Sequence, residues 1–137
     1  MSSYGGSNDA ASPNLIREAI QAAGGGTAVS STQYDGVIVV HAGYGNESTA
    51  SRSGSASNGD NGDVWSVVAT FAVANGFTEG ACIPAREARV AGGAVTGTIP
   101  VTGVLCHEFG HLLGLPDLYD TSSGTSKWVG KWDIMDF

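Results

Sequence analysis

The stretch HEFGHLLGLPD, from His107 to Asp117, constrains the fold of this chain more than any other feature of its 137 residues. Two of the chain's three histidines stand four residues apart in it, and Glu108 directly follows the first. Residues at i and i+4 share one side of an α-helix, so a helix would aim both imidazoles at a common point. Two such imidazoles can bind one zinc ion at roughly 2.0–2.1 Å each, while the adjacent carboxylate accepts a proton from a water. The stretch therefore predicts a helix that carries a metal site, with Glu108 as general base.

A third ligand is expected close by, because a catalytic zinc takes three protein ligands and keeps one open position. Gly114 can adopt a positive φ and turn the chain sharply at the end of the helix. That turn would bring Asp117 back toward the ion, and Pro116 would stiffen the approach. Asp120 is the alternative ligand, and an aspartate after a proline is also common as a plain turn residue. The predicted ligand set is His107, His111 and Asp117.

Two helices are predicted. The segment PNLIREAIQAA has apolar residues at helical spacing, Ser12 is a suitable N-cap, and Pro13 is a suitable first helical residue. This pattern predicts a backing helix over 12–23. The second helix, which carries the metal site, is predicted over 101–113. The residues expected on its inner face are Val101, Val104, Leu105, Leu112 and Leu113.

The remaining segments predict an α/β domain. The runs 34–42 and 64–73 are rich in β-branched and apolar residues, which is typical of strands. Two shorter strand-like runs within 85–99 flank a Gly-Gly pair. These strands are expected to form one twisted mixed β-sheet. A polar loop over 43–63 and an irregular segment over 115–137, with Trp128, Trp132 and Met135 as apolar anchors, complete a single domain.

The charge balance and the N-terminus narrow the class of protein. The formal net charge is -7 and the sequence has no basic patch, which argues against a nucleic-acid partner. No apolar run has the length of a membrane span. Residues 1–11 are small and polar, and we expect them to be disordered. They have no positively charged start followed by an apolar run, so they do not read as a signal peptide.

Several segments resemble one family. HEFGHLLGLPDLYD (107–120) resembles the active-site stretch of the immune-inhibitor-A-type bacterial metallopeptidases, a metzincin-like group with the pattern HExxHxxGxx(H/D). WDIM (132–135) is similar to the family's Trp-Asp-hydrophobic-Met element, VIVVHAGYGNE (37–47) to its strand and loop, and DVWS (63–66) to its Asp-x-Trp-Ser element. The resemblance implies a metzincin-like zincin fold whose irregular C-terminal segment ends in a Met-turn. Met135 would be the methionine that lies under the metal without binding it.

By the same resemblance, residues 1–137 are a single metallopeptidase catalytic domain that acts as a zinc-dependent endopeptidase. Glu108 would activate the metal-bound water, and the substrate would be a protein or peptide that pairs with an exposed strand edge, for which 86–92 is the candidate. We expect an extracellular monomer. Metzincin-like enzymes continue past the Met-turn, so the C-terminal part of the family domain is expected to be missing here. The alternative is a zinc-binding fragment with weak or no activity that serves as a binding or structural module.

The other candidate residues carry less specific signals. Cys82 and Cys106 are the only cysteines in a chain that resembles exported proteins, so we predict a disulfide, with two buried thiols as the alternative. Four further residues are candidates for contacts with substrate or calcium: His41, Glu47, Asp60 and Asp63. A strand-end histidine with satisfied hydrogen bonds, and acidic residues that are simply solvated, are the alternatives for these four.

Overall fold

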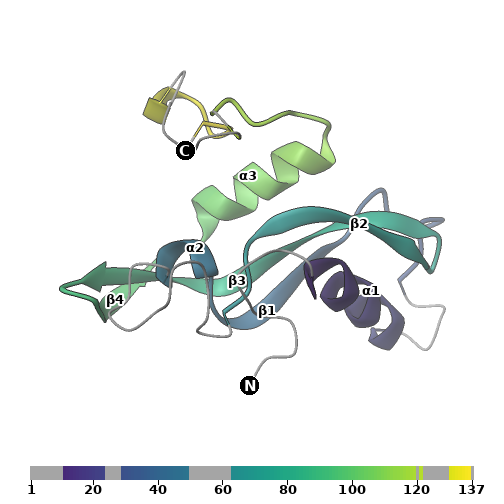
Figure 1. The fold of residues 1–137 in the computed structure, drawn as a ribbon. Coiled ribbons are helices and arrows are strands. Elements are labelled where there is room, and N and C mark those ends of the chain that lie inside the picture. The colour runs from purple at the N-terminus through teal and green to yellow at the C-terminus, as the bar shows by residue number, and fades with distance from the viewer. Residues whose placement is uncertain (1–10, 24–28, 50–62, 120, 122–129, 137) are drawn as a thin grey trace.

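The structure is a computed structural model that describes residues 11–23, 29–49, 63–119, 121 and 130–136. The predicted disordered segment therefore lies outside the described residues, except for Ala11. In chain order the elements are α1 (Ser12–Ala22), β1 (Ile38–Tyr44), α2 (Asn46–Thr49), β2 (Val67–Ala74), β3 (Phe77–Ala91), β4 (Ala94–Ile99), α3 (Thr102–Leu112) and the short 3-10 turn η2 (Gly130–Trp132) (Figure 1). None of the helices in these ranges is long and apolar enough to cross a membrane.

One mixed four-stranded sheet is the centre of the fold, as predicted. Its order is β1-β3-β2, with β1 parallel to β3 and β2 antiparallel to it. Cys82 of β3 stands opposite Val39 of β1 on one side and Val67 of β2 on the other. The end of β3 turns back through Gly92 and Gly93, which both have positive φ, and pairs with β4 as an antiparallel hairpin. This hairpin is the one predicted around the Gly-Gly pair.

The first half of the central strand β3 was not predicted, because it contains residues that are unusual inside strands. A Cβ at Gly80 would lie 2.7 Å from Val37 Cγ1 and 2.9 Å from Ile16 Cγ2, so glycine is needed for α1 to approach the sheet this closely. Pro84 stands opposite His41 of β1 and lies beyond Cys82, where the pairing with β2 ends. Its missing N–H therefore breaks no hydrogen bond to β2.

The apolar core lies between α1 and the sheet. Ile16 and Ile20 of α1 are buried, and they cluster with Val64, Ala74, Phe77 and Cys82. This is the backing helix predicted from the apolar spacing of 12–23. Its N-cap differs from the prediction: Ala11 takes that position, and Ser12 is buried inside the first turn. Pro13 is still in the first turn, where its missing N–H has no intrahelical partner to lose.

Two strands begin later than predicted. β1 starts at Ile38, while Tyr34 precedes the strand and is 55% exposed, and β1 is only partly buried. β2 starts at Val67, and Val64 forms only an isolated bridge with Gly45. The short helix α2 lies within the predicted polar loop, most of whose remainder falls outside the described residues.

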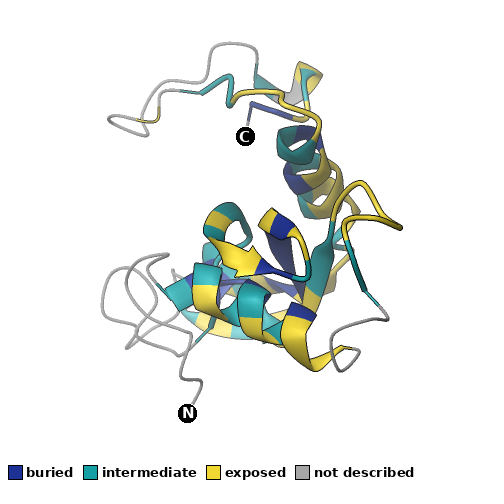
Figure 2. Cartoon of the chain, turned by 90° about the vertical axis from the view of Figure 1, so that its right-hand side faces the viewer, coloured by how far each residue is buried: buried dark blue, intermediate teal, exposed yellow. Residues whose placement is uncertain are grey.

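The helix α3 forms where it was predicted, but its inner face differs from the prediction. Glu108 and Gly110 are its buried residues. One flank of the helix is exposed (Figure 2), and apolar residues lie on this flank. These side chains are Leu105 (36%), Phe109 (50%) and Leu113 (66%). The predicted inner positions Leu105 and Leu113 therefore belong to the exposed flank.

Candidate active site

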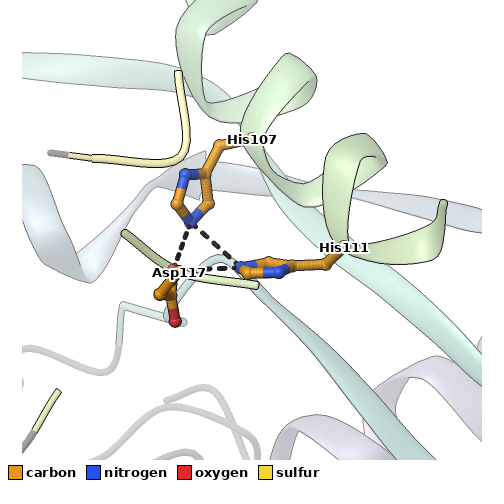
Figure 3. A group of neighbouring side chains, drawn as sticks. All are labelled: His107, His111 and Asp117. Carbon is orange, nitrogen blue, oxygen red and sulfur yellow. Dashed lines mark hydrogen bonds and ion pairs between the residues drawn. The ribbon is translucent and has the colours of Figure 1, made fainter. Parts of the chain in front are cut away.

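A tight turn ends α3 and reverses the chain beneath it. Gly114 has φ +85°, the conformation expected for it from the sequence. Its N–H donates to the His111 carbonyl at 2.8 Å, and the Leu115 N–H donates to the Gly110 carbonyl at 3.0 Å. This pair of bonds is the Schellman motif, which satisfies carbonyls at the end of a helix. The turn carries the chain back so that Asp117 faces the histidines of α3 (Figure 3).

Three side chains, His107, His111 and Asp117, converge on one point and are called the ligand triad below. The Nε2 atoms of the two histidines are 3.1 Å apart, and their rings are nearly perpendicular at 88°. Asp117 Oδ1 lies 3.3 Å from each Nε2 (Figure 3). All three side chains are partly buried. The structure thus brings together the residues that the sequence nominated as metal ligands.

The hydrogen bonds behind the triad fix which ring nitrogen carries the proton. His107 Nδ1 lies 2.9 Å from the Ile134 carbonyl oxygen, and His111 Nδ1 lies 2.8 Å from the Leu115 carbonyl oxygen. A carbonyl only accepts, so each Nδ1 donates its hydrogen and a neutral ring presents a lone pair at Nε2. Asp117 Oδ1 is buried and has no hydrogen-bond donor among the described residues. With both rings neutral, three lone pairs face one another, an arrangement that a bound cation would stabilise.

The spacing of the triad fits a small tetrahedral metal ion. Ligands at roughly 2.0–2.1 Å from a tetrahedral ion lie about 3.3 Å from one another. The three measured separations, 3.1, 3.3 and 3.3 Å, agree with this value. In the ranges that the structure describes, no other three His, Cys, Asp or Glu side chains converge in this way. The triad could therefore hold one metal ion.

An open pocket of about 410 Å³ lies in front of the triad. Glu108 lines this pocket and is only 5% exposed, so the carboxylate next to the first ligand faces the same space as the metal position. Tyr119 also lines it, with its ring stacked on that of His107 at 6.4 Å between centroids. The remaining wall comes from Ser66 and the first two residues of β2, Val67 and Val68.

These wall residues were not assigned a role from the sequence. The DVWS element (63–66) was the sequence feature that could have identified them. Its similarity to the family element indicated this region but did not show which side chain lines the pocket. Tyr119 stands two residues after Asp117, and that closeness was its only sequence signal.

Met135 packs beneath α3. It is 2% exposed, and a Cβ at Gly110 would lie 2.6 Å from its Sδ atom, so the methionine rests on the bare helix backbone. The Leu118 N–H donates to the Met135 carbonyl at 2.8 Å, which ties the two segments together. Trp132, predicted as an apolar anchor of this segment, is instead 93% exposed, and Trp128 lies outside the described residues.

The candidates for substrate or calcium contacts do not join the triad. His41 bonds its neighbour's carbonyl, with Nδ1 at 3.0 Å from the Ala42 oxygen, and is not in the pocket wall. The Asp63 carboxylate accepts from the Thr49 hydroxyl at 2.7 Å, and Glu47 accepts from Ser66. No calcium site is supported among these described residues. Asp60 and the alternative ligand Asp120 both lie outside the described residues.

The predicted disulfide is wrong for this structure, in which both cysteines are free. Cys82 is buried in the central strand, and its thiol donates to the Trp65 carbonyl at 3.3 Å. Burial raises the pKa of the Cys82 thiol to about 12. Cys106 is exposed on α3. The two positions were paired only because no other cysteines exist, and the fold gives each of them a different environment.

Comparison with known families settles the class of the domain. Residues 6–137 match the family described as immune inhibitor A peptidase M6, catalytic domain. The chain belongs to this family. The resemblance seen in the sequence is thereby confirmed, and the chain carries a catalytic domain of the metallopeptidase class. The described α/β fold with its mixed sheet is compatible with such a domain.

Two curated relatives of this M6 domain are similar over a short segment. Both are named pre-pro-metalloprotease PrtV and come from two strains of Vibrio cholerae serotype O1. Each is 59% identical over 34 residues, which is 24% of this chain and 4% of the relative. The chain thus matches only a small part of the length of these relatives. No solved structure gives a significant match.

Proposed function

We propose that this M6 domain is a zinc-dependent endopeptidase, with His107, His111 and Asp117 as the metal ligands. The observation that carries the proposal is the convergence of three potential ligand atoms at 3.1–3.3 Å beside a buried carboxylate. Two imidazoles and one carboxylate form a donor set that zinc accepts, and the open pocket leaves room for a fourth ligand. The backbone carbonyls behind each ring hold the ligands in the required orientation.

Glu108 is the proposed general base. When bound, the metal supplies Lewis-acid polarisation of the peptide carbonyl and lowers the pKa of the attacking water. Glu108 accepts the proton of that water and then delivers it to the nitrogen of the leaving amine. Its burial at 5% exposure keeps the carboxylate away from bulk solvent and directed at the pocket. Tyr119, stacked on His107, closes one side of the same space.

The substrate is proposed to lie along the edge of β2. This strand is last in the order β1-β3-β2, and its first residues, Val67 and Val68, line the pocket. An extended peptide can add to such an edge through main-chain hydrogen bonds. The edge expected from the sequence, residues 86–92, is a poorer candidate, because Glu87–Ala91 already pair with β4 on one side.

The finer family features are also part of the proposal. Met135 is proposed to be the methionine of a metzincin Met-turn, since it packs on Gly110 and its neighbour Ile134 holds the His107 ring. An extracellular site of action is proposed from the family resemblance, and a monomeric state is proposed alongside it.

Cleavage of unfolded casein tests the function. The zinc-loaded protein should cleave it, a chelator should stop cleavage, and added zinc should restore it. Glu108→Gln is the matched variant, because glutamine fills the same space but accepts no proton. It should keep its zinc and lose about 10²–10⁴-fold in kcat. Chelator-insensitive cleavage, or a Glu108→Gln variant with more than a tenth of the normal kcat, would contradict the proposal. No cleavage at full zinc occupancy would support a zinc-binding module without activity.

A further inference from the structure

The carboxylates of Glu47 and Glu87 lie close together beside Gly45, outside the pocket. Glu87, on β3, is only 3% exposed, and Glu47 belongs to α2, which lies against β3 (Figure 1). A Cβ at Gly45 would lie 2.5 Å from Glu87 Oε1 and 2.6 Å from Glu47 Oε1. Both oxygens thus crowd around one point that only a glycine leaves open. The two acidic groups are therefore direct neighbours.

The Glu47 carboxylate is well satisfied as an anion. The Ser66 hydroxyl donates to its Oε1, and the Ser66 N–H donates to its Oε2 at 3.3 Å. Ser66 is the residue before β2 and part of the pocket wall. Glu47 therefore holds the start of β2 at the place where this strand borders the metal position.

Glu87 has no comparable donors. Neither of its carboxylate oxygens has a hydrogen-bond partner in the part of the chain that the structure describes. The nearby Ser48 hydroxyl directs its proton to the Gly45 carbonyl at 3.0 Å and accepts from the Ala88 N–H at 2.9 Å. A buried carboxylate without a donor is costly, whereas a carboxylic acid can donate its own proton to the neighbouring acceptor.

Among the described residues, no ion pair joins either glutamate to a basic side chain. On β3, Arg86 and Arg89 are exposed, and the Arg86 guanidinium stacks on the Tyr44 ring at 4.7 Å. The other titratable side chains on β3 and the elements packed against it are Glu79 and the buried thiol of Cys82 on β3, His41 and Tyr44 on β1, Arg17 and Glu18 on α1, and Cys106, His107, Glu108 and His111 on α3; Asp63, just before β2, is engaged with Thr49. The pKa of Glu87 is raised from 4.5 to about 7, chiefly by burial; the nearby Ser48 hydroxyl lowers this pKa, and the neighbouring Glu47 adds to the rise.

We propose that Glu87 is a neutral acid that donates its proton to Glu47, and that this acid–carboxylate pair positions Ser66 and the start of β2. Both glutamates are positioning residues, because neither lines the pocket. A shared proton fits better than a bound cation, since Glu47 already accepts from Ser66 with both oxygens and no third acidic or histidine ligand joins the pair among the described residues. The consequence for cleavage rests on the proposed function; the consequence for stability does not.

The pair makes stability depend on pH with a definite sign. The folded-state pKa of Glu87 lies above the ordinary glutamate value of 4.5. Its contribution is therefore fully present below about pH 4.5 and is lost as the pH rises through about 7, because only the unfolded chain releases the proton readily in that range. Above that range two adjacent anions repel each other and the hold on Ser66 weakens.

Thermal unfolding of the zinc-loaded protein between pH 5 and 8.5 tests the pair. Glu87→Gln keeps a hydrogen-bond donor toward Glu47 and carries no charge. Its Tm should match the wild-type Tm at pH 5 and exceed it by several degrees at pH 8.5. Glu79→Gln is the control, since Glu79 is an exposed glutamate of the same strand, and its Tm should run parallel to the wild type. If the Tm difference between Glu87→Gln and the wild type is the same at all pH values, Glu87 does not share a proton with Glu47 and the proposal is wrong.

Two further measurements complete the test. Glu47→Gln should also flatten the pH dependence of Tm, but it should raise KM for a peptide substrate at every pH because one Ser66 bond is lost. For the wild type, the ratio of its KM to that of Glu87→Gln should rise several-fold from pH 6 to pH 8.5. A constant ratio would refute the positioning role, while absence of cleavage in all variants would refute only the proposed function. A rise in wild-type Tm on adding calcium, absent in both variants, would show a cation site and overturn the proposal.

Discussion

Replacing Gly110 by alanine places a methyl group where Met135 rests on α3. The new Cβ would lie 2.6 Å from Met135 Sδ and 3.4 Å from its Cε, so the buried methionine must move. Overpacking of this kind costs about 1–3 kcal/mol. The substitution also removes a helical glycine, which contributes about 1 kcal/mol in the opposite direction. We therefore expect Gly110→Ala to range from neutral to about 2 kcal/mol less stable than the wild type.

A matched variant separates the two effects. Gly103 lies on the same helix, and a Cβ there would meet nothing within 4 Å. Gly103→Ala should therefore show the gain in helix propensity without overpacking. The difference between the two variants then reports the collision with Met135. For a chain of this size each kcal/mol corresponds to about 4 °C, so we expect Gly110→Ala to melt about 4–12 °C below Gly103→Ala.

The same substitution should reach the metal site. Ile134 precedes Met135 and its carbonyl accepts from His107 Nδ1, so a displaced methionine shifts the group that orients a ligand. Loss of such support typically weakens metal binding by about 10–100-fold. Competition with a chromogenic chelator measures this for both alanine variants. If Gly110→Ala is as stable as Gly103→Ala and binds zinc equally well, the packing of Met135 does not support the site and the reasoning fails.

Further expectations concern the ligand triad and the thiols. Asp117→Ala should lose most of its zinc affinity while Asp120→Ala keeps it; loss of metal in Asp120→Ala alone would move the third ligand along the chain. His41→Ala should leave zinc binding unchanged, because His41 is not in the pocket wall; a drop in occupancy would contradict this. In the native protein without reductant, an alkylating reagent should modify Cys106 and reach Cys82 only after unfolding, as intact mass would show. If neither cysteine is alkylated in denaturant without reductant, Cys82 and Cys106 form a disulfide after all.

The sequence predicted features that depend on local rules. Gly114 ends α3 with a positive φ because few other residues tolerate that conformation, and the Gly92-Gly93 hairpin forms for the same reason. The i, i+4 spacing brings His107 and His111 together because helix geometry leaves little choice. These signals involve residues close together in the chain, so no knowledge of the tertiary fold was needed.

Features set by tertiary contacts escaped prediction. Gly80 weakens a strand signal, yet the approach of Ile16 makes it necessary in the central strand. Leu105 fits the apolar pattern of α3 but faces solvent, since the pattern of one helix does not say which flank the sheet covers. The Glu47–Ser66 contact joins residues that are 19 positions apart, and neither local sequence predicts it. In each case the deciding neighbour lies far away along the chain.

All three proposed ligands come from one helix and the turn after it, within eleven consecutive residues. Closing so short a loop costs little chain entropy, so metal binding does not require contacts between distant segments to form first. We therefore expect the refolding chain to load its metal early, as soon as α3 and its Schellman turn form, and the sheet to assemble around a site that is already occupied. Stopped-flow refolding with a zinc-sensitive dye would show this as metal uptake that precedes the burial of the core. Uptake that follows burial would mean that the His107–Ile134 tether, and not the local helix, decides when the site can bind.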